Sequence, residues 1–185
     1  MNLAADDEFV TRTRRWLERA VIGLNLCPFA KAVYNKQQVR IIVSDATTEA
    51  ALLAELGEEL ATLRDTDPEM IDTTLIVHPH VLTSFLDYND FLDLADGLVA
   101  EMDLEGIIQV ASFHPDYQFA DADIDDVSNN TNRSPYPTLH LLREESIDKA
   151  VAAYPEPDVI FERNIETVRD LGHDGYRALL SETNG

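Results

Sequence analysis

The sequence is poor in basic residues and has a single cysteine. Lysine and arginine together number 14, against 35 aspartates and glutamates, and the formal net charge is −21. Such a charge repels nucleic acids and acidic membranes, so we expect neither as a partner. The one basic cluster, Arg12, Arg14, Arg15 and Arg19, is interpreted as a solvated helix face that pairs with nearby carboxylates. One cysteine excludes an internal disulfide and is typical of a reducing cytoplasm.

Long apolar segments are also missing. No run of about 18 apolar residues is present, which predicts that no helix spans a membrane. The first residues, MNLAADDEF, are acidic and lack the apolar segment of a signal peptide, so we expect a cytoplasmic protein. With 45% apolar and 26% charged residues, the composition is that of a folded protein. We expect one globular domain over residues 1–185, which is long enough to bury its own core.

Several well-known catalytic and cofactor motifs are missing as well. The seven glycines are scattered and form neither G-x-G-x-x-G nor G-x-x-x-x-G-K-[ST], which disfavours the classical nucleotide-binding enzymes. There is no G-x-S-x-G elbow, which disfavours serine hydrolases of that type. The metal-ligand spacings H-E-x-x-H and C-x-x-C do not occur. The sequence therefore identifies no cofactor.

Helical and strand-like segments alternate along the chain. Short β-branched and apolar runs predict strands at 39–43, 73–77, 107–113 and 138–142. Apolar residues at helical spacing predict helices at about 7–24, 28–35, 47–64, 85–102, 146–154 and 158–171. Gly172 ends the last of these, and 176–180 adds a further turn or two. This alternation predicts an α/β fold: a small, mostly parallel sheet of about four strands with helices packed on its faces.

One long segment, after the third strand, has neither helical nor strand periodicity. His114 to Pro137 spans 24 residues, whereas compact domains rarely hold more than about 12–15 structureless residues in one connection unless the loop has a function. Its aromatic residues and prolines can bury apolar surface, which predicts a long ordered loop. We therefore place the candidate functional site in and around this loop.

Two of the predicted strands end in a histidine followed by a proline. Ligands of open α/β sheets bind beyond the carboxyl ends of strands, so parallel strands would bring His78 and His114 to the same edge. The alternative is two surface histidines at capped strand ends. His140 lies inside a predicted strand between two leucines, where a structural role is as good an interpretation as a catalytic one.

Cys27 is the candidate nucleophile. Pro28 follows it and is favourable at the first position of a helix, so the thiol would face unpaired amides and the positive end of the helix dipole. These lower the pKa of a thiol. Cys27 could then act as a nucleophile or redox thiol, with His114 or His140 as its acid or base. The alternative is a buried cysteine that serves as a small apolar residue.

A polar but stiff stretch closes the long loop. Residues 132–137 read NRSPYP, and the two prolines restrict their backbone. An arginine–asparagine pair recurs in the last helix. Arginine presents a planar fork to carboxylate or phosphate, so we expect a small anionic metabolite as partner. The residues expected to bind it are Asn132, Arg133, Tyr136, Arg163 and Asn164. The alternative is an arginine that ties the loop to the body of the protein through carbonyls.

Four phrases of the sequence, NLCPFA, SFHPDYQF, NNTNRSPYPTLHLLRE and IFERNIETV, resemble the bacterial family called domain of unknown function 1415. The resemblance covers nearly the whole chain. It implies a soluble protein of similar length with one intact domain, and it implies no particular reaction.

Three functions remain open at this point. The first is an enzyme with a Cys27/His114/His140 site in which Arg133 and Arg163 hold an anionic substrate. The second is a metal-dependent enzyme with His114, Asp116 and His140 as ligands. The third is a non-catalytic ligand-binding or regulatory module. The substrate, the reaction and the oligomeric state are not defined by any motif.

Overall fold

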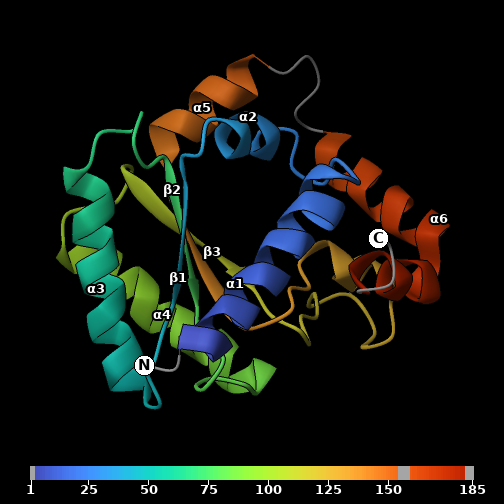
Figure 1. Cartoon of the computed structure of the whole chain (residues 1–185), viewed down its shortest axis with the longest axis horizontal. Helices are drawn as coiled ribbons and strands as arrows, with labels where there is room; N and C mark the ends of the chain where they lie inside the picture. The colour runs from blue at the N-terminus through green and yellow to red at the C-terminus, as the bar shows by residue number, and fades with distance from the viewer. Residues whose placement is uncertain (1–2, 154–158, 182–185) are drawn as a thin grey trace.

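Four short strands form one mixed sheet. A computed structural model describes residues 3–153 and 159–181. The strands are β1 (Val39–Val43), β2 (Thr73–Val77), β3 (Ile108–Phe113) and β4 (Thr138–Arg143), in the order β1-β2-β4-β3 (Figure 1). β1 and β2 pair in parallel, whereas β4 is antiparallel to both β2 and β3.

The prediction of a mostly parallel sheet is therefore wrong. β1, β2 and β3 run in the same direction. β4 lies between β2 and β3 and runs in the opposite direction, so two of the three pairings are antiparallel. The long loop makes this possible because it returns the chain to the edge where β3 ends, and Phe113 pairs with Thr138 there. An antiparallel neighbour needs no helical crossover, whereas a parallel one does.

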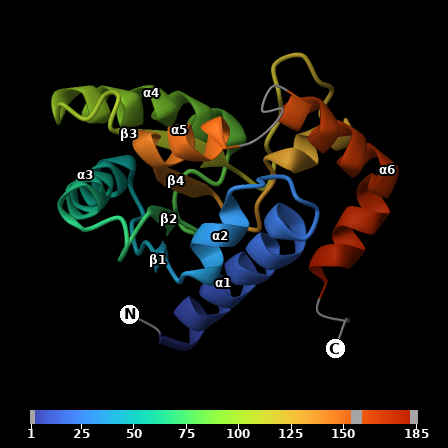
Figure 2. The ribbon, with the colours of Figure 1, turned by 90° about the horizontal axis from the view of Figure 1, so that it is seen from above.

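Helices cover both faces of the sheet (Figures 1 and 2). On one face, α3 (Glu49–Asp65) and α4 (Phe85–Glu101) bury their leucines and aromatic residues against Ile76, Leu139 and Leu141. On the other face, α1 (Leu3–Trp16) continues into a π-helix, η1 (Leu17–Ile22), and packs on Leu75. Because side chains alternate along a strand, Leu75 and Ile76 enter different cores.

Three further helices frame the second face. They are α2 (Ala30–Asn35), α5 (Glu144–Ala152) and α6 (Ile160–Leu180). α2 begins at Ala30, after the predicted start at residue 28. The predicted end of the helix at 154 and the predicted start of the next at 158 lie outside the described residues.

A kink at Gly172 divides α6. Its backbone has φ 68° and ψ 172°, a conformation that glycine adopts without the strain a side chain would add. The helix resumes at once and runs to Leu180, so the predicted break and the predicted further turns are both present. After the kink, His173 and Tyr176 donate hydrogen bonds to the loop carbonyls of Asp125 (2.8 Å) and Arg133 (3.1 Å).

The long loop is packed rather than open. It contains a 3-10 helix, η2 (Val127–Thr131), whose Asn129 is fully buried. The Asn129 side chain donates to the carbonyl of Asp123 (2.9 Å) and accepts from the amide of Phe119 (3.0 Å). These bonds connect the two halves of the loop, so the loop presents its side chains from a supported backbone.

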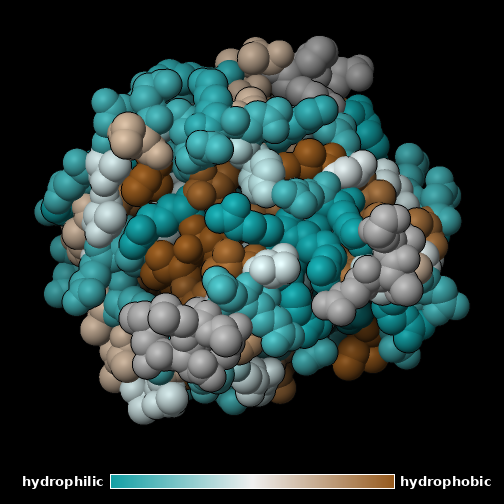
Figure 3. Space-filling model, in the orientation of Figure 1, coloured by the Kyte–Doolittle hydropathy of each residue, from teal (hydrophilic) through white to brown (hydrophobic). Residues whose placement is uncertain are grey.

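The surface of the sheet edge differs from that of the helices. β1 is an edge strand, and all five of its residues are partly exposed. Apolar side chains gather in the hollow between α1 and α3, while hydrophilic side chains cover most of the rest of this face (Figure 3).

Within the described ranges, no helix has the length and apolar character that crossing a membrane requires.

Candidate functional sites

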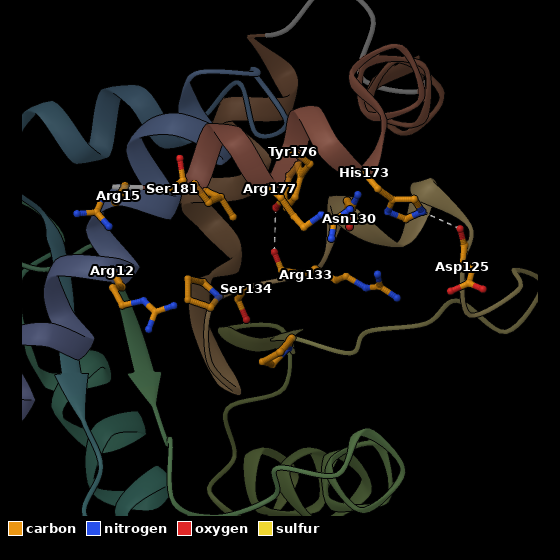
Figure 4. Close-up of a pocket in the computed structure, with 13 residues that line it drawn as sticks. Arg12, Arg15, Asp125, Asn130, Arg133, Ser134, His173, Tyr176, Arg177 and Ser181 are labelled. Carbon is orange, nitrogen blue, oxygen red and sulfur yellow. Dashed lines mark hydrogen bonds between the residues drawn. The ribbon is translucent and has the colours of Figure 1, made fainter. Parts of the chain in front are cut away.

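A pocket of about 660 Å³ opens where α1, the long loop and the end of α6 meet (Figure 4). Four arginines line it, and we call it the arginine pocket: Arg12 and Arg15 from α1, Arg133 from the loop and Arg177 from α6. Asp125 is the one acidic residue among its described lining residues. In a chain with 14 basic residues and a net charge of −21, this is a strong local concentration of positive charge.

Arg133 is held in place by the loop itself. Its Nε donates to the carbonyl of Tyr117 (3.1 Å) and its Nη2 to that of Ile124 (2.9 Å). Its Nη1 has no acceptor in the part of the chain that the structure describes. Arg133 therefore ties the loop to itself rather than to the body of the protein, and it also lines the pocket. Whether it binds an anion stays a prediction.

Two other arginines of the pocket are held only weakly. The guanidinium of Arg12 lies 5.3 Å from the ring centroid of Tyr136 and 3.7 Å from the carboxylate of Glu8. Arg177 pairs with Asp174 one turn away on exposed surface. Exposed ion pairs contribute about 0–1 kcal/mol, so little free energy opposes a turn of either guanidinium toward a bound anion.

Asn130 adds a buried donor to this pocket. The residue is 4% exposed and lines the pocket, yet its side-chain Nδ2 has no hydrogen-bond acceptor among the described residues. A buried donor without a partner costs about 1–3 kcal/mol. An acceptor oxygen of a ligand in the pocket would remove that cost.

A second cavity, of about 590 Å³, lies between η1, α2, α5 and the sheet face that carries α1. We call it the apolar cavity because carbon-rich side chains dominate its walls, among them Trp16, Val21, Phe29, Leu75 and Phe113. Cys27 and His140 also line it. The structure thus brings together two of the three predicted catalytic residues.

Hydrogen bonding determines the tautomer of His140. The hydroxyl of Thr73 donates its single proton to the carbonyl of Leu141 (2.6 Å), so it must accept from Nε2 of His140, also at 2.6 Å. Nδ1 therefore carries a lone pair, and no described residue donates to it. Burial lowers the pKa of His140 to about 4, which keeps the imidazole neutral at neutral pH.

Of the two interpretations of Cys27, the surroundings of the thiol resemble those of the buried apolar cysteine. The amides of Phe29 and Ala30 do hydrogen-bond to the sulfur and act to lower its pKa, as expected for a cysteine before a helix. Burial has the larger effect and raises the pKa of Cys27. The thiol is therefore protonated at neutral pH and packs among apolar neighbours such as Leu24.

His114 and His78 lie at the same sheet edge, as the common direction of β2 and β3 predicts, but both are fully buried. His114 accepts from the amide of Asp116 at Nδ1 (3.0 Å) and donates from Nε2 to the carbonyl of Leu82 (3.2 Å). Both ring nitrogens are thus occupied, and burial lowers the pKa of His114. This geometry leaves no nitrogen free for proton transfer or for a metal.

Most of the remaining predicted residues make contacts that connect parts of the fold. Asn132 donates from Nδ2 to the carbonyl of Ser112 (3.5 Å), and Tyr136 packs edge-on against Phe9. Asn164 donates to the carbonyl of Leu26 (2.7 Å), and so ties α6 to the turn before Cys27. Arg163, on α6, lines neither cavity.

The expected single site is therefore divided. Cys27 and His140 share the apolar cavity, Arg133 lines the arginine pocket, and His114 lines neither. Within 3–153 and 159–181, no three side chains of histidine, cysteine, aspartate or glutamate converge as metal ligands would.

Sequence analysis missed four residues of the arginine pocket, namely Arg12, Arg15, Asn130 and Arg177. The basic cluster in the first helix was the available signal, and two of its members line the pocket. The packing of α6 across the loop supplies the partner surface, and no local pattern in the sequence contains that information.

Comparison with known proteins identifies the family alone. A family model described as "Protein of unknown function (DUF1415)" matches residues 8–178, nearly the whole chain. No curated protein and no solved structure matches the chain. The chain belongs to the DUF1415 family.

Proposed function

We propose that this protein binds a small anionic metabolite in the arginine pocket. The observation that supports this is the convergence of four arginines and the buried, unsatisfied amide of Asn130 on one pocket of an otherwise acidic protein. Four guanidinium groups give the pocket a positive potential, and a bound anion would accept their hydrogen bonds.

The pocket suits an anion with more than one charged group. Its volume of about 660 Å³ is within the usual range of small-molecule sites, about 300–1,000 Å³. Arginines reach it from three separate elements, α1, the loop and α6 (Figure 4). Arg133 is oriented in advance, whereas Arg12 and Arg177 can adjust. A diphosphate or a tricarboxylate can contact several of these groups at once, which a monoanion of acetate size cannot.

A binding function has more support than thiol catalysis. The candidate nucleophile Cys27 is protonated and lines the other cavity, so it shares no pocket with Arg133. A protonated thiol is a poor nucleophile. The anion is thus proposed as a bound ligand, with no covalent step assigned to Cys27.

Calorimetric titration with pyrophosphate, citrate and acetate tests the proposal. We expect binding of pyrophosphate or citrate and much weaker binding of acetate. Arg133→Gln and Arg177→Gln should each weaken binding about 10-fold or more, because a charge-assisted hydrogen bond is worth about 1.5–3 kcal/mol. Arg177→Gln is the cleaner variant, since Arg133 also supports the loop and its loss should lower the melting temperature.

Arg64→Gln is the matched control. Arg64 lies near the end of α3, where it pairs with Asp65 on exposed surface. Its replacement changes the net charge by the same single unit as the pocket variants. Equal losses of affinity in Arg64→Gln and Arg177→Gln would mean that only long-range charge matters, and the proposed site would be wrong. The absence of binding to every anion at millimolar concentration would also contradict it.

A further inference from the structure

The apolar cavity has a hydrogen-bond acceptor in a wall that is otherwise almost entirely apolar. Trp16, Leu17, Val21, Leu75 and Phe113 form much of that wall, and the cavity measures about 590 Å³. Ligand sites typically combine such walls with a few placed polar groups that orient the ligand. The cavity is separate from the arginine pocket and shares no lining residue with it.

The acceptor is Nδ1 of His140. Thr73 fixes the ring proton on Nε2, because its own proton is committed to the carbonyl of Leu141. The alternation of β4 places His140 on the face opposite Leu139 and Leu141, which are buried in the other core, and on the face of the apolar cavity. Nδ1 is thus a lone pair held at the cavity with no donor from the described chain.

The charged groups of the cavity do not favour a charged ligand. The guanidinium of Arg143 already donates to the carbonyls of Leu63, Thr66 and Ile71, which leaves it committed to the end of α3. Asp72 lies at the cavity, where its carboxylate accepts from Ser146 (2.6 Å) and repels an anion. A neutral imidazole cannot compensate the cost of burying an ion of either sign.

We propose that the apolar cavity is a second ligand site, which takes a neutral, mainly apolar molecule that donates one hydrogen bond, such as an alcohol or a phenol, to Nδ1 of His140. The ligand needs a donor because the Nε2–H tautomer offers only an acceptor. Its apolar body supplies the driving force by leaving water for the walls of the cavity.

Two matched probes test the donor requirement. They are 1-octanol and 1-methoxyheptane, which have the same number of heavy atoms, but only the alcohol can donate. Trp16 is the only tryptophan, and it lines the cavity, so its fluorescence reports occupancy. Protection of Cys27 from alkylation by iodoacetamide is the second readout. We expect both readouts to respond to the alcohol, with affinity about three- to tenfold above that of the ether.

Two variants test the role of His140. His140→Leu removes the acceptor and should bring the ratio of the two affinities to about one while binding persists. Thr73→Val keeps the shape of the strand but frees the imidazole to carry its proton on Nδ1, so the preference for the alcohol should also fall. Thr73→Val keeps the test decisive if His140→Leu fails to fold. Circular dichroism and melting curves establish that each variant is folded.

Several results would overturn the inference. Equal affinity of the wild type for alcohol and ether would remove the donor requirement. If the ratio of alcohol to ether affinity is unchanged in both folded variants, His140 does not accept the ligand's hydrogen bond. If neither probe changes the fluorescence or protects Cys27, the apolar cavity is not a ligand site. Tighter binding of octylammonium than of 1-octanol would mean that the ligand is a cation.

Discussion

Trp16 and Tyr176 are buried in the same apolar cluster, although each lines a different cavity. Trp16 lines the apolar cavity, whereas Tyr176 lines the arginine pocket. The Tyr176 hydroxyl donates to the carbonyl of Arg133 (3.1 Å). This hydroxyl thus connects α6 to the long loop.

Removal of that hydroxyl should destabilise the protein. In Tyr176→Phe, a change at a residue only 5% exposed, the carbonyl of Arg133 loses a donor. We expect the free energy of unfolding to fall by about 1–3 kcal/mol, measured by urea denaturation and circular dichroism. Tyr34→Phe, which removes a hydroxyl that bonds exposed Glu18, is the control and should cost less than about 1 kcal/mol. If Tyr176→Phe and Tyr34→Phe lower the free energy of unfolding equally, the hydroxyl of Tyr176 contributes no more to stability than an exposed one.

Acid should destabilise the protein through His78 and His140. Burial lowers the pKa of His78 and of His140 to about 4, against an ordinary value of 6.5. Between those values the unfolded chain binds protons that the folded chain does not. The stabilisation is therefore complete above pH 6.5 and is lost as pH falls toward 4, by ~1.4 kcal/mol per pH unit for each histidine.

Urea denaturation at pH 7, 6 and 5 measures that slope. His140→Leu should reduce the slope by ~1.4 kcal/mol per pH unit, the contribution of one histidine. His80→Gln, which removes a histidine at an exposed position, is the control for the loss of a histidine as such. Identical slopes in wild type and His140→Leu would mean that His140 binds its proton equally well in both states.

Cys27 should react slowly with thiol reagents in the native protein. Because burial raises its pKa, alkylation by iodoacetamide should increase with pH only above the range of an ordinary free cysteine. His140→Leu should not shift that profile, since a neutral imidazole places no charge beside the sulfur. A rate that is already at its plateau near neutral pH would instead identify a thiolate and restore Cys27 as a nucleophile.

Gly172→Ala should weaken both the fold and anion binding. The added Cβ meets no other atom within 4 Å, so its cost is backbone strain at φ 68°, about 1–3 kcal/mol. His173, Tyr176 and Arg177 follow the kink and line the arginine pocket, so a straighter helix would displace them. Melting curves and pyrophosphate titration measure the two effects.

Gly97→Ala is the matched control for that substitution. Gly97 is inside α4, and its added Cβ also meets nothing within 4 Å. Because its backbone is helical, alanine should stabilise the protein by about 0.5–1 kcal/mol. A stabilising effect at both glycines would mean that the kink at Gly172 is not needed.

The local structure follows from the sequence alone. The strands at 39–43 and 73–77 begin and end where their β-branched runs predict, and α3 and α4 follow the spacing of their leucines and aromatic residues. The break at Gly172 was predictable because glycine is the residue that adopts a positive φ without strain. Each of these features depends on neighbours a few residues apart, which a sequence pattern contains.

The direction of β4, the division of the site and the state of Cys27 were decided by tertiary structure. A strand with Leu139 and Leu141 on one face has the same pattern in either direction. β4 is antiparallel because the long loop returns the chain to the sheet edge where β3 ends. Arg12, Arg133 and Arg177 line one pocket because α6 packs over the loop. The amides that lower the pKa of Cys27 are local to it, but the burial that outweighs them comes from elements distant in sequence.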